Sequence, residues 1–353
     1  MRHESEPVAG GVDPEQVAPT VAAGASTGLC GGGPDAAVVS TIPSLPSLHP
    51  FHPAPRTPRS GAGSATATPS RLTHVLLPAD SHVHTQWSWD APNGDMAGSC
   101  ARAVERGLPA IAFTEHLDHT VWRVAPDDLD PDHLLIRLSD PGGSLTPPAF
   151  DAAGYLAAVE DCRGRFPGLR ILSGLELGEP HRHPEQVAAV LGAGHFDRLL
   201  GSLHTLPDDG GYAEPPGLLR HRAPAEVLRS YLAEVAALVT ASDVFGVLAH
   251  VDYPVRSWPA AGDAFTPEDF EEEFRHTLRA TAQSGRALEL STVVPLHTTI
   301  VRWWHEEGGD AITFGSDAHD PTTVARGFRD AVHMAEAHGF RPGERPYDLW
   351  GRA

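Results

Sequence analysis

The chain has 353 residues and a formal net charge of −20 at pH 7, and this length suffices for one large barrel or two ordinary domains. The acidic balance argues against non-specific binding to nucleic acid or to a membrane surface, and no apolar run is long enough to span a membrane. All 26 basic residues are arginine, which excludes lysine Schiff-base chemistry and a P-loop lysine.

The cysteines and the N-terminus indicate the compartment in which the protein works. Cysteine occurs only at Cys30, Cys100 and Cys162, and no two of these form a C-x-x-C motif. A disulfide framework or a thiolate zinc finger is therefore not expected, and a reducing cytoplasm fits best. The first residues lack the basic and apolar regions of a signal peptide, which also favours a cytoplasmic location.

Two segments of different composition follow one another along the chain. Residues 1–71 are rich in Gly, Pro, Ala, Ser and Thr and show little periodicity. Such a segment cannot bury enough apolar surface to offset the entropy of ordering, so we expect a disordered tail. From residue 72 to about 345, apolar runs alternate with helical patterns, and this segment is the predicted catalytic domain.

Seven apolar, strand-like runs make up the predicted sheet of this domain, and they end near His82, Phe113, Leu175, Leu203, Ala249, Leu290 and Phe314. Helical patterns lie between and after them, at 97–106, 151–165, 184–191, 225–240, 267–283, 296–307 and 322–338. This alternation predicts an α/β fold with a parallel sheet covered by helices, a (β/α)7 barrel one unit short of the common eight. Two inserts rich in Pro, Gly and Asp, 121–148 and 206–222, follow strand ends and are expected to rim the pocket.

Side chains that bind cations follow most of these strands. In a parallel barrel the chemistry lies at the C-terminal ends of the strands, and those ends carry His82, His84, His116, Glu176, His204, His250, Asp317 and His319. Imidazole and carboxylate together suit zinc, iron or manganese. Each residue alone would be an ordinary polar residue at a strand mouth, but their recurrence at distant strand ends predicts a metal centre.

Two of these strand ends show a spacing that suits shared binding. Residues i and i+2 of a strand point to the same side of the sheet. His82 and His84 can therefore reach one metal ion, and Asp317 and His319 repeat the spacing. The sixth predicted strand differs, because its end offers Glu289 and a serine instead of a histidine.

In combination and order, these motifs resemble the PHP family, whose members include polymerase-associated domains and histidinol phosphatases. The motifs are H-x-H at 82–84, T-E-H at 114–116, G-L-E at 174–176, S-L-H at 202–204, L-A-H at 248–250 and S-D-A-H at 316–319. The resemblance covers about residues 75–340 and implies a distorted (β/α)7, TIM-like barrel with two or three metal ions. The stretches 288–292 and 312–319 resemble the histidinol-phosphatase-like branch most.

The resemblance also implies how nine residues would share divalent ions of zinc, iron or manganese. His82, His84, Glu176 and Asp317 would hold a first ion, Glu176 would bridge to a second ion held by His204 and His250, and Asp90, His116 and His319 would hold a third. One common version of the family pattern has histidine where this chain has Asp90. Carboxylate is an acceptable ligand, so this departure bears on the identity and occupancy of the third ion.

The activity that the resemblance implies is hydrolysis of histidinol phosphate to histidinol and phosphate by a metal-bound hydroxide. Arg256 follows His250 by six residues, where histidinol phosphatases also have a basic residue, and its guanidinium would match the phosphate. Asp118, His119 and Asp252 lie near ligand positions in the sequence and are candidates to protonate the leaving alkoxide. The resemblance thus implies an enzyme with a small phosphorylated substrate.

Three alternatives stay open at this point. A PHP phosphoesterase could act on another small phosphomonoester or a nucleotide, although the acidic chain disfavours nucleic acid. A barrel without activity could bind metal as a scaffold, but eight of the nine expected ligand positions match directly. An amidohydrolase barrel also uses H-x-H, usually with a carboxylated lysine, which this chain lacks. The sequence does not determine the oligomeric state.

Overall fold

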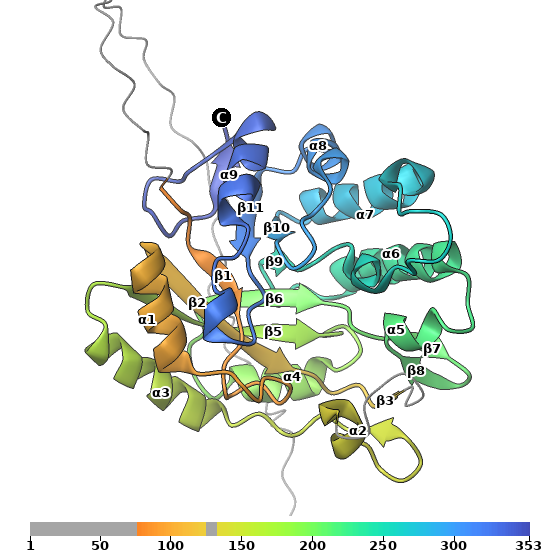
Figure 1. Cartoon of the computed structure of the whole chain (residues 1–353), viewed down its shortest axis with the longest axis horizontal. Coiled ribbons are helices and arrows are strands. Elements are labelled where there is room, and N and C mark those ends of the chain that lie inside the picture. The colour runs from red at the N-terminus through yellow and green to blue at the C-terminus, as the bar shows by residue number, and fades with distance from the viewer. Residues whose placement is uncertain (1–75, 125–132) are drawn as a thin grey trace, which may run out of the picture. The chain divides into compact units, whose positions relative to one another are not determined.

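The computed structural model describes residues 76–124 and 133–353 (Figure 1). The predicted tail, residues 1–71, and part of the first predicted insert lie outside the described residues. Among the helices of the described ranges, none is long and apolar enough to cross a membrane.

A curled, nine-stranded sheet forms the centre of the described domain (Figure 1). Its strands follow the order β1 (Asp80–Val83), β2 (Ala110–Leu117), β5 (Arg170–Gly178), β6 (Arg198–Ser202), β9 (Val247–Leu248), β10 (Ala287–Ser291), β11 (Ala311–Gly315), β13 (Trp350–Arg352) and β12 (Phe340–Arg341). The strands from β1 to β11 in this order pair in parallel, which confirms the predicted (β/α)7 arrangement. An isolated parallel bridge between Val83 and Ala318 brings the first and last of them together, so the barrel closes through little regular pairing.

Two C-terminal strands extend the sheet beyond the predicted seven. β13 pairs antiparallel with β11, and β12 pairs antiparallel with β13. Trp350 of β13 is buried, and its ring meets that of Phe314 edge to face at 4.9 Å. The described domain therefore continues past residue 345, where the sequence analysis ends it.

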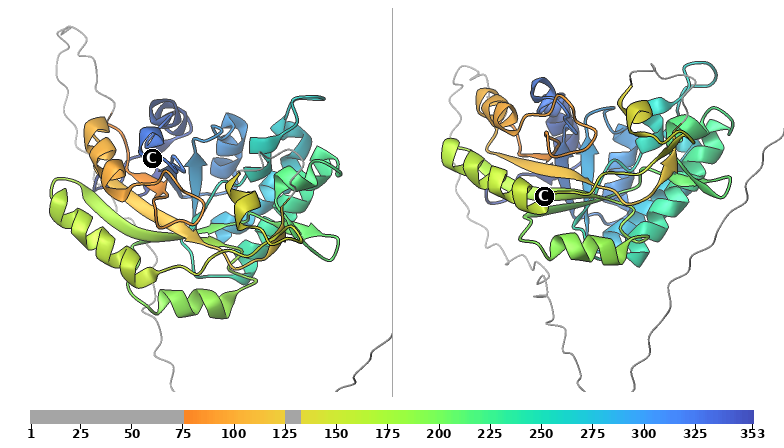
Figure 2. Two further views of the ribbon diagram at one scale, coloured as in Figure 1. Left: turned by 60° about the horizontal axis from the view of Figure 1, so that its bottom comes forward. Right: turned by 90° about the horizontal axis from the view of Figure 1, so that it is seen from below.

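Helices line the outside of the curled sheet (Figures 1 and 2), and the longer ones are α1 (Met96–Arg106), α3 (Ala152–Arg165), α4 (Pro184–Leu191), α6 (Pro224–Ala241), α7 (Glu271–Gln283), α8 (Thr298–Glu306) and α9 (Phe328–Ala337). The sequence sets several of their starts. The side chains of Asp95 and Asp151 accept hydrogen bonds from the first turns of α1 and α3, and α4 and α6 begin with proline. α6, for example, buries a stripe that includes Val227, Tyr231 and Val235 and joins it to the core.

The helix predicted at 322–338 begins later than expected. A 3₁₀ turn, η4 (Pro321–Thr323), comes first, and α9 starts only at Phe328. Ala325 (φ 54°) and Gly327 (φ 67°) between them adopt left-handed backbone, which ends a right-handed helix. The Ala325 N–H donates to Asp80 at 2.8 Å, so this loop is tied to β1.

The two predicted inserts form a second, small sheet, with strands in the order β4 (Ser144–Leu145), β3 (Trp122–Arg123), β8 (Gly211–Ala213) and β7 (Leu206–Asp208). Ala213 joins the inserts because it pairs with Arg123 on one side and with Leu206 on the other. The short helices α2 (Leu134–Leu138) and α5 (Pro215–Leu218) belong to the same inserts. Residues of both inserts line one cavity together with His116, as expected for segments that rim the pocket.

Candidate metal centre

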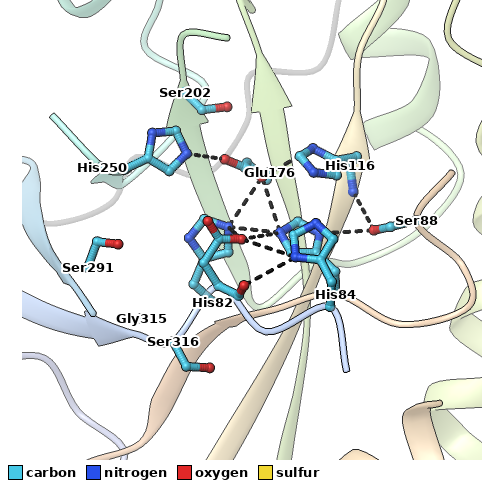
Figure 3. A network of polar contacts seen from close by, with 12 residues as sticks. His82, His84, Ser88, His116, Glu176, Ser202, His250, Ser291, Gly315 and Ser316 are labelled. Atoms are coloured by element: carbon cyan, nitrogen blue, oxygen red, sulfur yellow. Dashed lines mark hydrogen bonds and ion pairs between the residues drawn. The ribbon is translucent and has the colours of Figure 1, made fainter. Parts of the chain in front are cut away.

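The nine predicted ligand residues lie together at the C-terminal end of the parallel strands. Figure 3 shows His82, His84, His116 and His250 around Glu176. His116 of β2 and Glu176 of β5 stand opposite each other in the strand register. Asp317, just after β11, has left-handed backbone (φ 47°), and its N–H donates to the His82 carbonyl at 2.8 Å. Such backbone in a non-glycine residue is uncommon and gathers at functional sites.

The first group of side chains consists of His82, His84, Glu176 and Asp317. The Nε2 atoms of His82 and His84 lie 3.0 Å apart. Glu176 Oε2 lies 3.2 Å from the first and 3.3 Å from the second of these nitrogens. Asp317 Oδ1 lies 3.2 Å from His84 Nε2. The structure therefore brings together the four residues predicted to share one ion.

A second group of side chains, Glu176, His204 and His250, adjoins the first. Glu176 Oε1, the other oxygen of the same carboxylate, lies 3.1 Å from His204 Nε2 and 2.6 Å from His250 Nε2. Glu176 thus faces two groups of histidines at once, as a bridging carboxylate must.

The third group contains Asp90, whose Oδ2 lies 3.2 Å from the Nε2 atoms of both His116 and His319. The aspartate found where one family pattern has histidine therefore points into the cluster. A turn residue that faced solvent would not point there.

The donor set fits divalent cations, because several buried atoms lack the partner that a cation would supply. Glu176 Oε2 and His116 Nδ1 lie 3.2 Å apart without hydrogen-bond geometry, and neither has a hydrogen bond to another described residue. Asp90 Oδ1 and His250 Nδ1 are also buried and have no hydrogen bond to another described residue. Since unpaired buried polar atoms are costly, this mixture of imidazole and carboxylate is suited to bound metal.

The charge of Glu176 is also set by its surroundings. Burial acts to raise the pKa of this carboxyl, but the positive charges that His82, His204 and His116 can carry outweigh burial and hold the pKa well below its usual range. A carboxylate that stays ionised with both oxygens aimed at nitrogen donors is a suitable ligand for two cations.

Neighbouring side chains fix the rings of three histidines. His82 Nδ1 contacts Glu289 Oε1 at 2.7 Å, and His204 Nδ1 contacts Asp118 Oδ1 at 3.1 Å. His84 Nδ1 contacts the Ser88 hydroxyl at 2.9 Å, and that hydroxyl in turn donates to Glu115 at 2.6 Å. In each ring the Nδ1–H is held by an acceptor, which leaves the Nε2 lone pair directed into the cluster.

Glu289 has a wider role than the sequence revealed. Besides contacting His82, its Oε2 accepts the backbone N–H of His250 at 2.7 Å, so one buried carboxylate orients two predicted ligands. Gly315 of the next strand leaves room for it, since a Cβ there would collide with the Glu289 carboxylate. A buried acid within an apolar strand, Leu288–Leu290, was the available signal.

Replacing Glu289 by glutamine is expected to lower metal affinity about 10- to 100-fold, the usual cost of losing a side chain that orients a ligand. The amide keeps the size of the side chain but loses the charge that holds His82. Metal titration of the variant beside Glu336→Gln, an exposed control on α9, measures the effect. Equal affinities in the two variants would reduce Glu289 to a packing role.

Arg256 belongs to the cavity that opens over this cluster. The cavity has a volume of about 500 Å³ and is lined by His116, Glu176 and Arg256, among other residues. Arg256 Nη1 donates to Asp317 Oδ2 at 2.6 Å, Nη2 donates to Ser291 Oγ at 3.3 Å, and the guanidinium lies over the Tyr253 ring. Its predicted place beside the ligands therefore agrees with the geometry, and a role as a surface arginine does not.

The three candidate proton donors fare differently. Asp118 lines the cavity, but it contacts His204 and accepts from Trp89 Nε1 at 3.0 Å, which makes it a positioning group rather than a free acid. His119 and Asp252 are not among the residues that line the cavity. The His119 ring lies near that of His183, with 5.8 Å between the centroids. The geometry therefore gives no support for a catalytic His119.

The fold and the site together define a TIM-like barrel with a cluster suited to several divalent cations. The model of the PHP domain matches residues 80–293, more than half of the chain, and the chain belongs to this family. It is 24% identical over 271 residues to a probable histidinol-phosphatase of Clostridium acetobutylicum, which covers 74% of this chain and 94% of that protein. It is 27% identical to a probable histidinol-phosphatase of Deinococcus radiodurans, over 72% of this chain and 90% of that protein.

Solved structures show the same fold. Histidinol phosphate phosphatase of Lactococcus lactis, crystallised with zinc, L-histidinol and phosphate, matches with a TM-score of 0.62 and 20% identity, over 78% of this chain and 97% of that one. A putative histidinol phosphatase of Listeria monocytogenes matches with a TM-score of 0.56 and 16% identity, over 71% and 99%. These matches confirm the predicted TIM-like barrel fold.

Proposed function

We propose that the chain is a metal-dependent phosphatase that hydrolyses histidinol phosphate to histidinol and phosphate. The observation that carries this proposal is the cluster of nine His, Asp and Glu side chains, seven of which line one cavity together with Arg256. A volume of about 500 Å³ lies within the usual range of small-molecule sites. The names of the relatives, and the ligands of the Lactococcus lactis structure, support histidinol phosphate as the substrate.

Two or three ions of zinc, iron or manganese would occupy the three side-chain groups, with His82, His84, Glu176 and Asp317 at the first, Glu176, His204 and His250 at the second, and Asp90, His116 and His319 at the third. Such ions, when bound, lower the pKa of a water molecule toward neutrality and neutralise phosphate oxygens. The imidazoles and carboxylates of the cluster are directed at one another, as ligands of shared ions would be, so the proposed nucleophile is the water molecule.

The chain's own residues hold the ligand side chains in place and orient the phosphate of the substrate. Glu176 shares its two oxygens between neighbouring groups, and Glu289 and Asp118 keep His82 and His204 in place. Arg256 is fixed by Asp317 at the edge of the cluster, and its remaining N–H groups are available to a phosphoryl oxygen. The location we propose is the cytoplasm, which the scarce cysteines support.

A screen of phosphomonoesters with the purified, metal-loaded protein tests the proposed substrate. L-Histidinol phosphate should give a higher kcat/KM than nucleoside monophosphates, sugar phosphates and aryl phosphates. A clear preference for nucleotides would support the alternative of a PHP phosphoesterase with another substrate. Absence of activity on every ester, with metal bound, would support a binding barrel.

A further inference from the structure

Part of the cavity lining is not made of the proposed ligands. It consists of aromatic side chains and a further acid, among them Trp89, Trp122, Tyr253 and Glu214. The rings of Trp89 and Trp122 lie 5.7 Å apart and are tilted by 57°. The Trp89 ring also lies 6.0 Å from that of His116, so this part of the lining adjoins the ligand cluster. A ligand bound at the cluster would therefore meet aromatic side chains and the Glu214 carboxylate.

The backbone holds Glu214 in a fixed place in the cavity lining. It directly follows Ala213, which is paired on both sides in the small sheet. Its carbonyl accepts hydrogen bonds from the N–H groups of Gly217 and Leu218, at 3.0 and 3.1 Å, at the start of α5. The side chain is therefore presented to the cavity from a rigid junction between a strand and a helix.

The carboxylate of Glu214 has no partner of its own. No hydrogen bond or ion pair joins it to another residue of the described ranges. The nearest cavity guanidinium, Arg256, is already engaged by Asp317 and Ser291. Burial raises the pKa of the Glu214 carboxyl to about 7, against a smaller opposite effect of His204. A half-buried acid that lines a cavity and has no counter-ion favours binding of a cation from outside the chain.

We propose that Glu214 is a specificity residue that binds the positively charged nitrogen group of the substrate's organic part. This rests on the proposed function, which places the phosphate at the ligand cluster and Arg256. The chemical class recognised would be the phosphate ester of an amino alcohol, with its cation at Glu214. The Trp89 ring in the same cavity lining adds cation–π attraction for the same group.

The test compares phosphate esters that carry a cation with esters that do not. Four substrates serve: L-histidinol phosphate and 2-aminoethyl phosphate are cationic, and ethyl phosphate and 4-nitrophenyl phosphate are neutral in their organic parts. The variants are Glu214→Gln, which removes only the charge, Glu214→Asp, which keeps it, and Glu226→Gln, an exposed control on α6. Bound metal is measured in each variant.

Glu214→Gln should lower kcat/KM on the two cationic esters by about 10- to 100-fold, the worth of one charge-assisted hydrogen bond. The loss should lie mainly in KM, because such binding is similar in the ground and transition states. The neutral esters and the metal content should be unchanged, and Glu214→Asp should recover part of the loss.

Other outcomes would overturn the proposal. An equal loss on all four esters would place Glu214 in the reaction itself, a loss of metal would place it among the ligands, and no loss on any ester would leave it without a role. The proposed function can fail separately. If the wild-type protein prefers 2-aminoethyl phosphate over ethyl phosphate but ignores histidinol phosphate, the substrate is wrong while the role of Glu214 stands.

Discussion

The variant Glu176→Gln is expected to lose far more activity than any other single change at this site. Loss of a residue that only orients a ligand lowers metal affinity or activity roughly 10- to 100-fold. The kcat/KM of Glu176→Gln should fall further than this, because Glu176 itself is a proposed ligand. Glutamine keeps the shape of the side chain but removes a charge that lies within 3.3 Å of the Nε2 atoms of His82 and His84 and also faces His204 and His250. Two side-chain groups would then lose their shared ligand.

Steady-state kinetics and elemental analysis of the same preparation measure this effect. Glu185→Gln, an exposed change on α4, is the matched control, because it removes the same charge away from the cavity. Circular dichroism confirms that both variants are folded. Normal kinetics and metal content in Glu176→Gln would mean that this residue only ends a strand.

The second large effect is expected for Arg256→Ala, which should raise KM and also lower kcat. Charge on the phosphoryl oxygens persists into the transition state, so a donor to these oxygens contributes to both parameters. Arg256→Lys should recover only part of the activity, because an ammonium group cannot match a phosphate in the manner of a planar fork. Metal content is a second readout, because Arg256 also forms an ion pair with Asp317, a proposed ligand. If the main role of Arg256 is to hold phosphate, the metal content of the variant should remain near normal.

Histidinol phosphate and an aryl phosphate should be compared in this experiment, with Arg229→Ala as an exposed control. Equal losses on both substrates place Arg256 at the phosphate that they share. A loss confined to histidinol phosphate would move it to the amine or imidazole side. No loss on either substrate would contradict a role for Arg256 in the site.

The barrel could be predicted from the sequence because each buried parallel strand is an apolar run that ends in a polar residue. Local pattern therefore located β2, β5 and β6 and the residues at their ends, such as His116 and Glu176. The start of α9 was missed because Ala325, whose backbone is left-handed, is held by a hydrogen bond to Asp80 of β1, a contact that no local pattern encodes.

Elements built from distant segments could not be predicted. The small sheet joins two inserts about 90 residues apart through the pairing of Arg123 with Ala213, and each insert alone reads as a loop. The same holds at the site. The role of Glu289 depends on its contact with His82, which lies 207 residues away in the sequence. The proposed role of Glu214 depends on its place in the lining of the cavity, which only the folded chain shows.

The metal content of the freshly purified, full-length protein tests the central claim most directly. Elemental analysis should find two to three ions of zinc, iron or manganese per chain, which would occupy the three proposed groups of side chains. Chelation should abolish hydrolysis of histidinol phosphate, and readdition of the metal should restore it. Protein that contains no metal and hydrolyses the ester at full rate would contradict the account.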